Sequence, residues 1–208
     1  MPVSRNLRTL QLSLMLGWQD VRQAYRRSAL GPFWISAGMA VQITTMGVVF
    51  GVIFKTPLQE YLPFLATSIT LWGFMSAVIT DGSMSFIAAE SIIKQLHLPM
   101  YIHVFRTVWK QLIIFGHNLV ILPLVFLAVL HPISWSLLLF IPGLMVAVAN
   151  VTWIAFFLAI LSARYRDIPQ VIVSVMTILY FVSPVMWQPS LIPAGTAHIL
   201  LEIGRASC

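Results

Sequence analysis

The chain has 208 residues and a formal net charge of +6; 59% of its residues are hydrophobic and only 9% are charged. Soluble domains carry about 25% charged residues, so this composition excludes a soluble globular domain, a disordered chain and a disulfide scaffold. The single cysteine, Cys208, allows no disulfide within the chain. The composition predicts an all-α polytopic membrane protein, whose excess positive charge reflects membrane topology and not nucleic-acid binding.

The first predicted element is an amphipathic helix over residues 4–29. Apolar residues recur there at spacings of three and four, which places them on one helical stripe. The stripe comprises Leu7, Leu10, Leu14, Trp18, Val21 and Tyr25. Basic residues lie mainly off the stripe, a pattern typical of a helix that lies flat in the lipid headgroup region. The alternative is a helix packed against another protein.

Five segments then follow that are apolar enough to span a membrane. A hydrocarbon core about 30 Å thick takes about 20 residues of helix to cross. The predicted spans lie near residues 32–54, 62–80, 112–130, 133–163 and 169–187. Together they predict a polytopic helical bundle of about five spans, preceded by the interfacial helix.

The basic residues orient these spans. Ten Lys and Arg side chains precede the first span or lie in the loops after the second and fourth. They are Arg5, Arg8, Arg22, Arg26, Arg27, Lys94, Arg106, Lys110, Arg164 and Arg166. The opposite side carries Lys55, and the C-terminal tail carries Arg205. Cytoplasmic loops concentrate positive charge, so the N-terminus is predicted to be cytoplasmic and the C-terminus to lie outside.

The longest predicted cytoplasmic loop runs from Asp81 to Gln111. Glu90 and Lys94 are spaced as an i,i+4 helix pair, and the segment is too apolar for a free loop. Pro99 is expected to end a short helix there. Two interpretations of that helix remain open: docking of a soluble partner, or return to the membrane interface.

Motifs for nucleotide, zinc or nucleophilic chemistry are absent from the sequence. We therefore expect a transport protein and not an enzyme, with no metal site and no cofactor bound by this chain.

His117, in the third span, is expected to bond to a neighbouring helix. A stand-alone secondary transporter or channel would need coupling residues in the spans, which are not evident. A membrane-bound transferase would have only His97 and His103 as candidates. Both remain alternatives.

Aromatic residues deep in the spans are candidates for lining a substrate conduit, because the C–H faces of sugars stack on aromatic rings. The candidates are Trp72, Trp153, Phe156, Tyr180 and Phe181. Ordinary helix packing or contact with lipid is the alternative for each of them.

Four motifs, spread in order over nearly the whole chain, resemble one known family. Residues 20–34 read DVRQAYRRSALGPFW, residues 115–119 FGHNL, residues 163–168 ARYRDI and residues 183–187 SPVMW. Together they are similar to the permease subunits of type-2 ABC exporters for polysaccharides and polyol phosphates.

This resemblance implies a homodimeric permease of the bacterial inner (cytoplasmic) membrane that pairs with a separate ATP-binding subunit, which would use the ATP. The expected substrate is a lipid-linked glycan of the O-antigen, capsular or teichoic-acid type. The resemblance also implies ATPase coupling through two cytoplasmic regions. Their candidate residues are Glu90, Lys94, Arg164, Arg166 and Asp167.

The same resemblance places the interfacial helix near the lipid head group. Tyr25, Arg26 and Arg27 are the candidates for contact with that group. Arginine forks match phosphate oxygens, so the two arginines could meet the pyrophosphate of a polyprenyl carrier. Their alternative role is as positively charged cytoplasmic anchors.

The C-terminal end departs from the family pattern. The family has six spans and a cytoplasmic C-terminus, whereas this sequence predicts five. Residues 1–203 are expected to form the transporter domain. Residues 204–208, GRASC, are an atypical tail that suggests a truncated or frame-shifted reading or a cloning scar.

Overall fold

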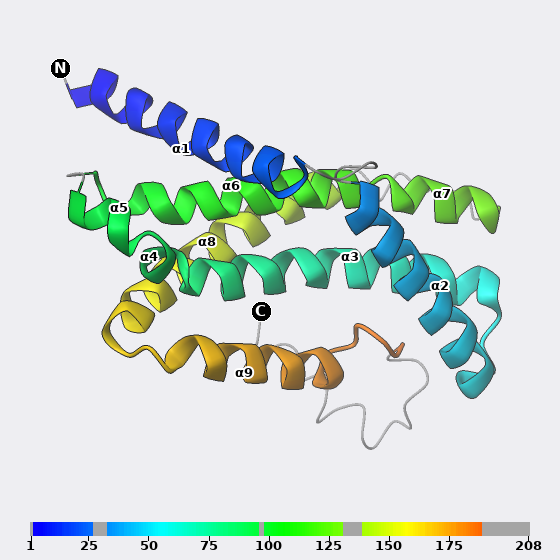
Figure 1. The fold of residues 1–208 in the computed structure, drawn as a ribbon. Helices are drawn as coiled ribbons and strands as arrows, with labels where there is room; N and C mark the ends of the chain where they lie inside the picture. Colours follow the sequence, from blue (N-terminus) through cyan, green and yellow to red (C-terminus); the bar gives the residue numbers. More distant parts are fainter. Residues whose placement is uncertain (1, 27–32, 96–97, 131–138, 189–208) are drawn as a thin grey trace.

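The structure is a computed structural model that describes residues 2–26, 33–95, 98–130 and 139–188 (Figure 1). Its regular elements within these ranges are all helices, which confirms the predicted all-α fold. The helices are α1 (Pro2–Ala24), α2 (Phe33–Phe54), α3 (Leu58–Ser83), α4 (Ser85–Ala88), α5 (Glu90–Gln95), α6 (Tyr101–Asn118), α7 (Ile121–Ala128), α8 (Phe140–Arg164) and α9 (Ile168–Val182).

Four helical segments are long and apolar enough to cross a membrane: α2, α3, α6 with α7, and α8. The fifth apolar helix, α9, has 15 residues and is shorter than a perpendicular span requires. A multi-pass helical protein is therefore confirmed. The predicted tail at residues 204–208, residues 27–29 of the first helix and the beginning of the predicted fourth span lie outside the described residues.

The helices do not follow every predicted span boundary. Helix α3 covers Leu58–Ser83 and extends a few residues beyond the predicted span 62–80. The third span begins at Tyr101 and not near residue 112, so Arg106 and Lys110 lie inside α6 instead of in a loop. Both cations face carboxylates of other helices, and this pairing allows them to lie within a helical bundle.

A break separates α6 from α7 although the two form one apolar segment. Pro123 has no backbone N–H and its ring clashes with the carbonyl four residues earlier, that of Leu119. The chain changes direction at Leu119 and Val120, where turn-type bonds replace the regular helical pattern. Figure 1 shows α7 continuing beyond α6 toward the same end of the molecule as the lower part of α2.

Helix α3 lies at the centre and packs against α2, α6, α8 and α9 (Figure 1). Toward its C-terminal end, Phe74 and Val78 share a buried cluster with side chains of α6 and α8. Toward its N-terminal end, Tyr61 and Leu65 share another with α2 and the turn after α9. The Tyr61 hydroxyl donates a hydrogen bond to the carbonyl of Met186, which ties that turn to α3.

Helix α1 runs beside α6 (Figure 1), and its buried face overlaps the predicted stripe only in part. Ser13, Gly17 and Val21 are buried; Val21 belongs to the stripe, whereas the stripe residue Trp18 is 56% exposed. A side chain at position 17 would lie 2.8 Å from the backbone oxygen of Arg106, so only glycine permits this close approach. The described side chains of α1 therefore pack on another helix of the same chain, an arrangement the sequence did not indicate.

Candidate head-group and coupling sites

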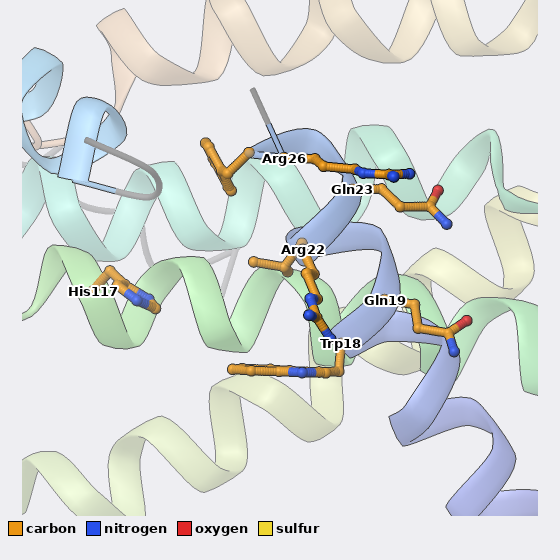
Figure 2. Close-up of a pocket in the computed structure, with 8 residues that line it drawn as sticks. Trp18, Gln19, Arg22, Gln23, Arg26 and His117 are labelled. Carbon is orange, nitrogen blue, oxygen red and sulfur yellow. The ribbon is translucent and has the colours of Figure 1, made fainter. Parts of the chain in front are cut away.

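A pocket of about 780 Å³ lies where the C-terminal half of α1 meets α6. Its lining combines cations, amides and aromatic rings: Trp18, Gln19, Val21, Arg22, Gln23, Tyr25, Arg26 and His117. Figure 2 shows the Arg22 side chain extending toward the Trp18 ring, with His117 on the neighbouring helix α6. The structure thus brings Tyr25 and Arg26, two of the predicted head-group residues, to one pocket, while Arg27 lies outside the described residues.

Sequence reasoning missed the other polar residues of this pocket. Trp18, Arg22 and Arg26 follow each other at i,i+4 spacing, which puts them on one helix face. That spacing was the available signal, and it was obscured because Trp18 was assigned to the buried stripe. The carbonyl of Ile113 lies 2.8 Å from His117 Nδ1, so this bond is made within α6. The bond predicted from His117 to a neighbouring helix stays a prediction for its other ring nitrogen, Nε2.

The pocket has the chemistry of an anion site beside an apolar surface. Arg22 and Arg26 are exposed cations with guanidinium donors that suit phosphate oxygens. Burial raises the pKa of the Tyr25 hydroxyl, an effect that the charge of Lys110 partly offsets. Tyr25 therefore stays protonated at neutral pH and serves as a hydrogen-bond donor.

A second group of residues joins the two predicted coupling regions. Lys94 Nζ lies 2.7 Å from Glu90 Oε1 within α5, as the i,i+4 spacing predicts. Arg166, in the turn between α8 and α9, lies 2.9 Å from the other oxygen of Glu90. Hydrogen bonding and charge from Lys94, followed by charge from Arg166, lower the pKa of Glu90. Glu90 is thus the link between the two regions.

The remaining predicted coupling residues lie beside this link. Arg164 is the last residue of α8 and is exposed. Asp167 precedes the first residue of α9, although its side chain makes no capping bond. The short helices α4 and α5 confirm the predicted helix between the second and third spans, and Pro99 lies between α5 and α6.

The predicted conduit aromatics fall into separate groups. The rings of Trp72 and Tyr180 lie 6.0 Å apart, centroid to centroid, between α3 and α9, and Phe181 lies next to Tyr180. On α8, Trp153 is 71% exposed and stacks on the neighbouring ring of Phe157. Phe156 instead packs edge-on against the buried ring of Phe86. Within one chain, the five candidates therefore do not form a continuous aromatic path.

Within the described ranges, no group of three or more His, Cys, Asp or Glu side chains is placed to hold a metal ion. Of the two histidines considered for enzyme chemistry, His97 lies outside the described residues and His103 is buried on α6.

Comparison with known proteins matches residues 11–200 to the ABC-2 type transporter model. The chain belongs to the ABC-2 type transporter family. This result confirms the resemblance drawn from the four motifs. As an ABC-2 transporter chain it is a transport subunit of a multi-pass membrane assembly, and the family implies a separate ATP-binding subunit.

The chain is also similar, at low sequence identity but over most of its length, to two named relatives. One is an O-antigen export system permease protein RfbA of Myxococcus xanthus, 18% identical over 91% of this chain and 73% of the relative. Another, with the same name, is from Klebsiella pneumoniae and is 22% identical over 88% of this chain and 71% of the relative.

Proposed function

We propose that this chain is the membrane-spanning permease subunit of an ATP-driven exporter that moves a lipid-linked polysaccharide across the cytoplasmic membrane. The family match over residues 11–200 carries this proposal, and relatives named for O-antigen export support the substrate class. The loop charges favour an N-terminus in the cytoplasm.

The energy for export comes from ATP hydrolysis in a partner subunit, and this chain binds no cofactor. The exposed surface around Glu90, Lys94 and Arg166 is the docking region for that subunit. Because Glu90 bonds to both α5 and the α8–α9 turn, a force applied to one region reaches the other directly. A second copy of this chain completes the permease, and membrane lipids surround it.

The pocket at the end of α1 receives the phosphate-containing head group of the lipid carrier. Arg22 and Arg26 bind its phosphate oxygens, and the Tyr25 hydroxyl donates a further bond. The exposed ring of Trp18 lies beside the apolar beginning of the lipid, as amphipathic aromatic side chains do at membrane interfaces. Trp72, Tyr180 and Phe181 contact the sugar chain; Trp153 and Phe156 do so only if the second copy completes their surroundings.

The deciding experiment is a mild-detergent pull-down from native membranes. We expect an ATP-binding subunit to copurify with the tagged chain. Recovery of the chain without any ATPase, together with substrate movement that depends on an ion gradient, would favour the stand-alone secondary transporter. Glycosyl or acyl transfer by the purified chain alone would favour the transferase.

The head-group assignment has its own test. The double variant Arg22→Gln, Arg26→Gln removes both charges but keeps polar side chains, although shorter ones. Glycan export at matched protein levels is expected to fall at least about tenfold, since two charge-assisted bonds are lost. A matched variant, Lys55→Gln, removes an exposed cation that lies outside the pocket and outside both predicted coupling regions. Unchanged export in the double variant would leave the two arginines as topological anchors.

A further inference from the structure

A second cavity, of about 340 Å³, lies among α1, α3, α4 and α6. It is separate from the head-group pocket and shares no lining residue with it. Its volume falls within the range of about 300–1,000 Å³ that is typical of small-molecule sites. What it can hold follows from its charges, its unpartnered polar atoms and its apolar wall.

The charged side chains of this cavity neutralise one another. Arg106 Nε donates to Asp20 Oδ2 at 2.6 Å, and a second guanidinium nitrogen reaches the other carboxylate oxygen. Lys110 Nζ donates to Asp81 Oδ2 at 2.8 Å. With two cations paired to two anions, the cavity presents no net charge to a guest. An ionic guest would have to displace an existing ion pair, so a neutral guest is favoured.

Two buried polar side chains of the cavity lack partners among the described residues. His103 is 2% exposed and Ser85 is 6% exposed. The two ring nitrogens of His103 and the hydroxyl of Ser85 have no hydrogen-bond partner among the described residues. Buried polar groups are almost always bonded, because leaving one unsatisfied is costly. A neutral imidazole offers one donor and one acceptor, and a hydroxyl offers both. A guest hydroxyl that reaches Ser85 or His103 would relieve part of this cost.

The cavity also has an apolar lining. Met84, Ala88 and Ile92 contribute it from the α3–α4 turn, α4 and α5. A guest that carries both hydroxyls and C–H faces can contact both kinds of lining. A pyranose ring has these two features.

We propose that this cavity binds one neutral sugar ring, with its hydroxyls on Ser85 and His103 and its C–H face on the wall formed by Met84, Ala88 and Ile92. The proposal rests on the proposed function, because the exported glycan is the natural source of such a ring. A free sugar would present the same chemistry. The site lies beside α4 and α5, so occupancy would be sensed next to the docking region of the ATPase.

The test uses the complex of this chain with its ATP-binding subunit in lipid nanodiscs. Cys208→Ser removes the native thiol, and Thr107→Cys then provides one thiol in the half-buried cavity lining, at a side chain to which the proposal assigns no sugar contact. Its reaction with a small maleimide is timed with and without the methyl glycosides of glucose, galactose, mannose and N-acetylglucosamine. Ser91→Cys, exposed on α5 and outside the cavity lining, is the matched control.

At least one glycoside is expected to slow labelling of Thr107→Cys about tenfold at ten times its Kd, while the control rate stays unchanged. Displacement of that glycoside by a lipid-linked oligosaccharide would identify the glycan as the source of the ring, and no displacement would identify a free sugar. A reactive thiol that no glycoside protects would overturn the proposal and leave a cavity filled by water only.

A second measurement applies if the cysteine variant is not labelled or not folded. Saturation-transfer NMR with the unmodified complex is expected to detect one of the same glycosides. Ala88→Leu, which fills the cavity from its apolar wall, is expected to abolish the signal. No transfer in the unmodified complex, or equal transfer in Ala88→Leu, overturns the proposal. Because the sample contains the copurified ATPase, either result leaves the proposed export function standing.

Discussion

At the scale of single residues, the paired contact of Asp20 with Arg106 fixes α1 against α6. The two side chains are 25% and 24% exposed, so breaking the pair strands a partly buried charge. We expect Asp20→Ala and Arg106→Ala each to lower the free energy of unfolding by about 1–3 kcal/mol. Thermal unfolding of the detergent-purified chain measures this, and a double-mutant cycle isolates the pair.

The matched control for this cycle is the exposed pair of Glu90 with Lys94. Lys94→Ala is expected to leave the stability nearly unchanged, because exposed i,i+4 pairs contribute little. Strictly additive effects of the Asp20 and Arg106 variants would show that the two side chains do not support each other.

These residues also show where sequence reasoning stopped. The charge of Arg106 was recognised and used to orient the spans, but its partner lies 86 positions away in the chain. Local spacing carries no information about such a pair. In contrast, the bond between Glu90 and Lys94 was predictable, because residues four positions apart lie on successive turns of the same helix face.

At the scale of helices, the contact of α1 with α6 depends on Gly17. A methyl group there would press on a backbone oxygen, which cannot rotate away as a side chain could. Overpacking typically costs about 1–3 kcal/mol, more than the gain of about 1 kcal/mol from alanine in a helix. We expect Gly17→Ala to lower the melting temperature of the purified chain. Gly116→Ala, where a methyl group meets nothing within 4 Å, should maintain or raise it.

The link between α5 and the α8–α9 turn should depend on pH through Glu90. Its folded-state pKa lies below the ordinary value, so its stabilising contribution is present above the unfolded pKa of about 4.3. That contribution is lost as the pH falls through the lower, folded pKa. Hydrogen exchange of the α8–α9 turn should therefore stay constant from neutral pH to about pH 5, after correction for the intrinsic rate, and rise at more acidic pH.

Two variants isolate the residues of this link. Glu90→Gln should make the turn exchange faster than in the unmodified chain at neutral pH and remove the acidic transition. Lys94→Ala should leave the bond from Arg166 to Glu90 in place and change the exchange only slightly. A transition that persists in Glu90→Gln would assign it to another group.

Helix existence was predictable from long apolar runs, but helix ends were not. The charges of Arg106 and Lys110 led to a third span that begins too late, because a sequence pattern cannot show that a distant carboxylate neutralises a cation. The fifth span was predicted to reach Trp187, yet α9 ends at Val182. Pro184 favours an extended conformation at Ser183, and the chain turns there.

At the scale of the whole molecule, the aromatic groups distinguish packing from transport. Trp72 and Tyr180 join α3 to α9, and their ring contact contributes about 0.5–1.5 kcal/mol beyond burial. Trp72→Ala is expected to reduce glycan export about tenfold at matched levels of folded protein. Trp72→Phe retains an aromatic face and should retain most of the export.

The exposed ring of Trp153 provides the comparison within the same assay. Trp153→Ala is expected to leave export near the unmodified level, because in one chain this ring stacks only on the side of α8. A loss of export as large as that of Trp72→Ala would mean that Trp153 lines the path in the assembled permease. If Trp72→Ala reduced the amount of folded protein as much as it reduced export, the Trp72 ring would have a packing role only.

The short helix α9 has a consequence for the lipid around the protein. Fifteen residues span about 22 Å, which leaves about 8 Å of a hydrocarbon core about 30 Å thick without helix. Beyond Val182 the chain turns inward, and the carbonyl of Met186 is held by the Tyr61 hydroxyl. The bilayer next to α9 should therefore be locally thinner. This thinning should bring water and lipid head groups closer to the aromatic pair of Trp72 and Tyr180. Cryo-electron microscopy of nanodiscs should show this thinning as an indentation of the lipid density beside α9; uniform thickness there would contradict it.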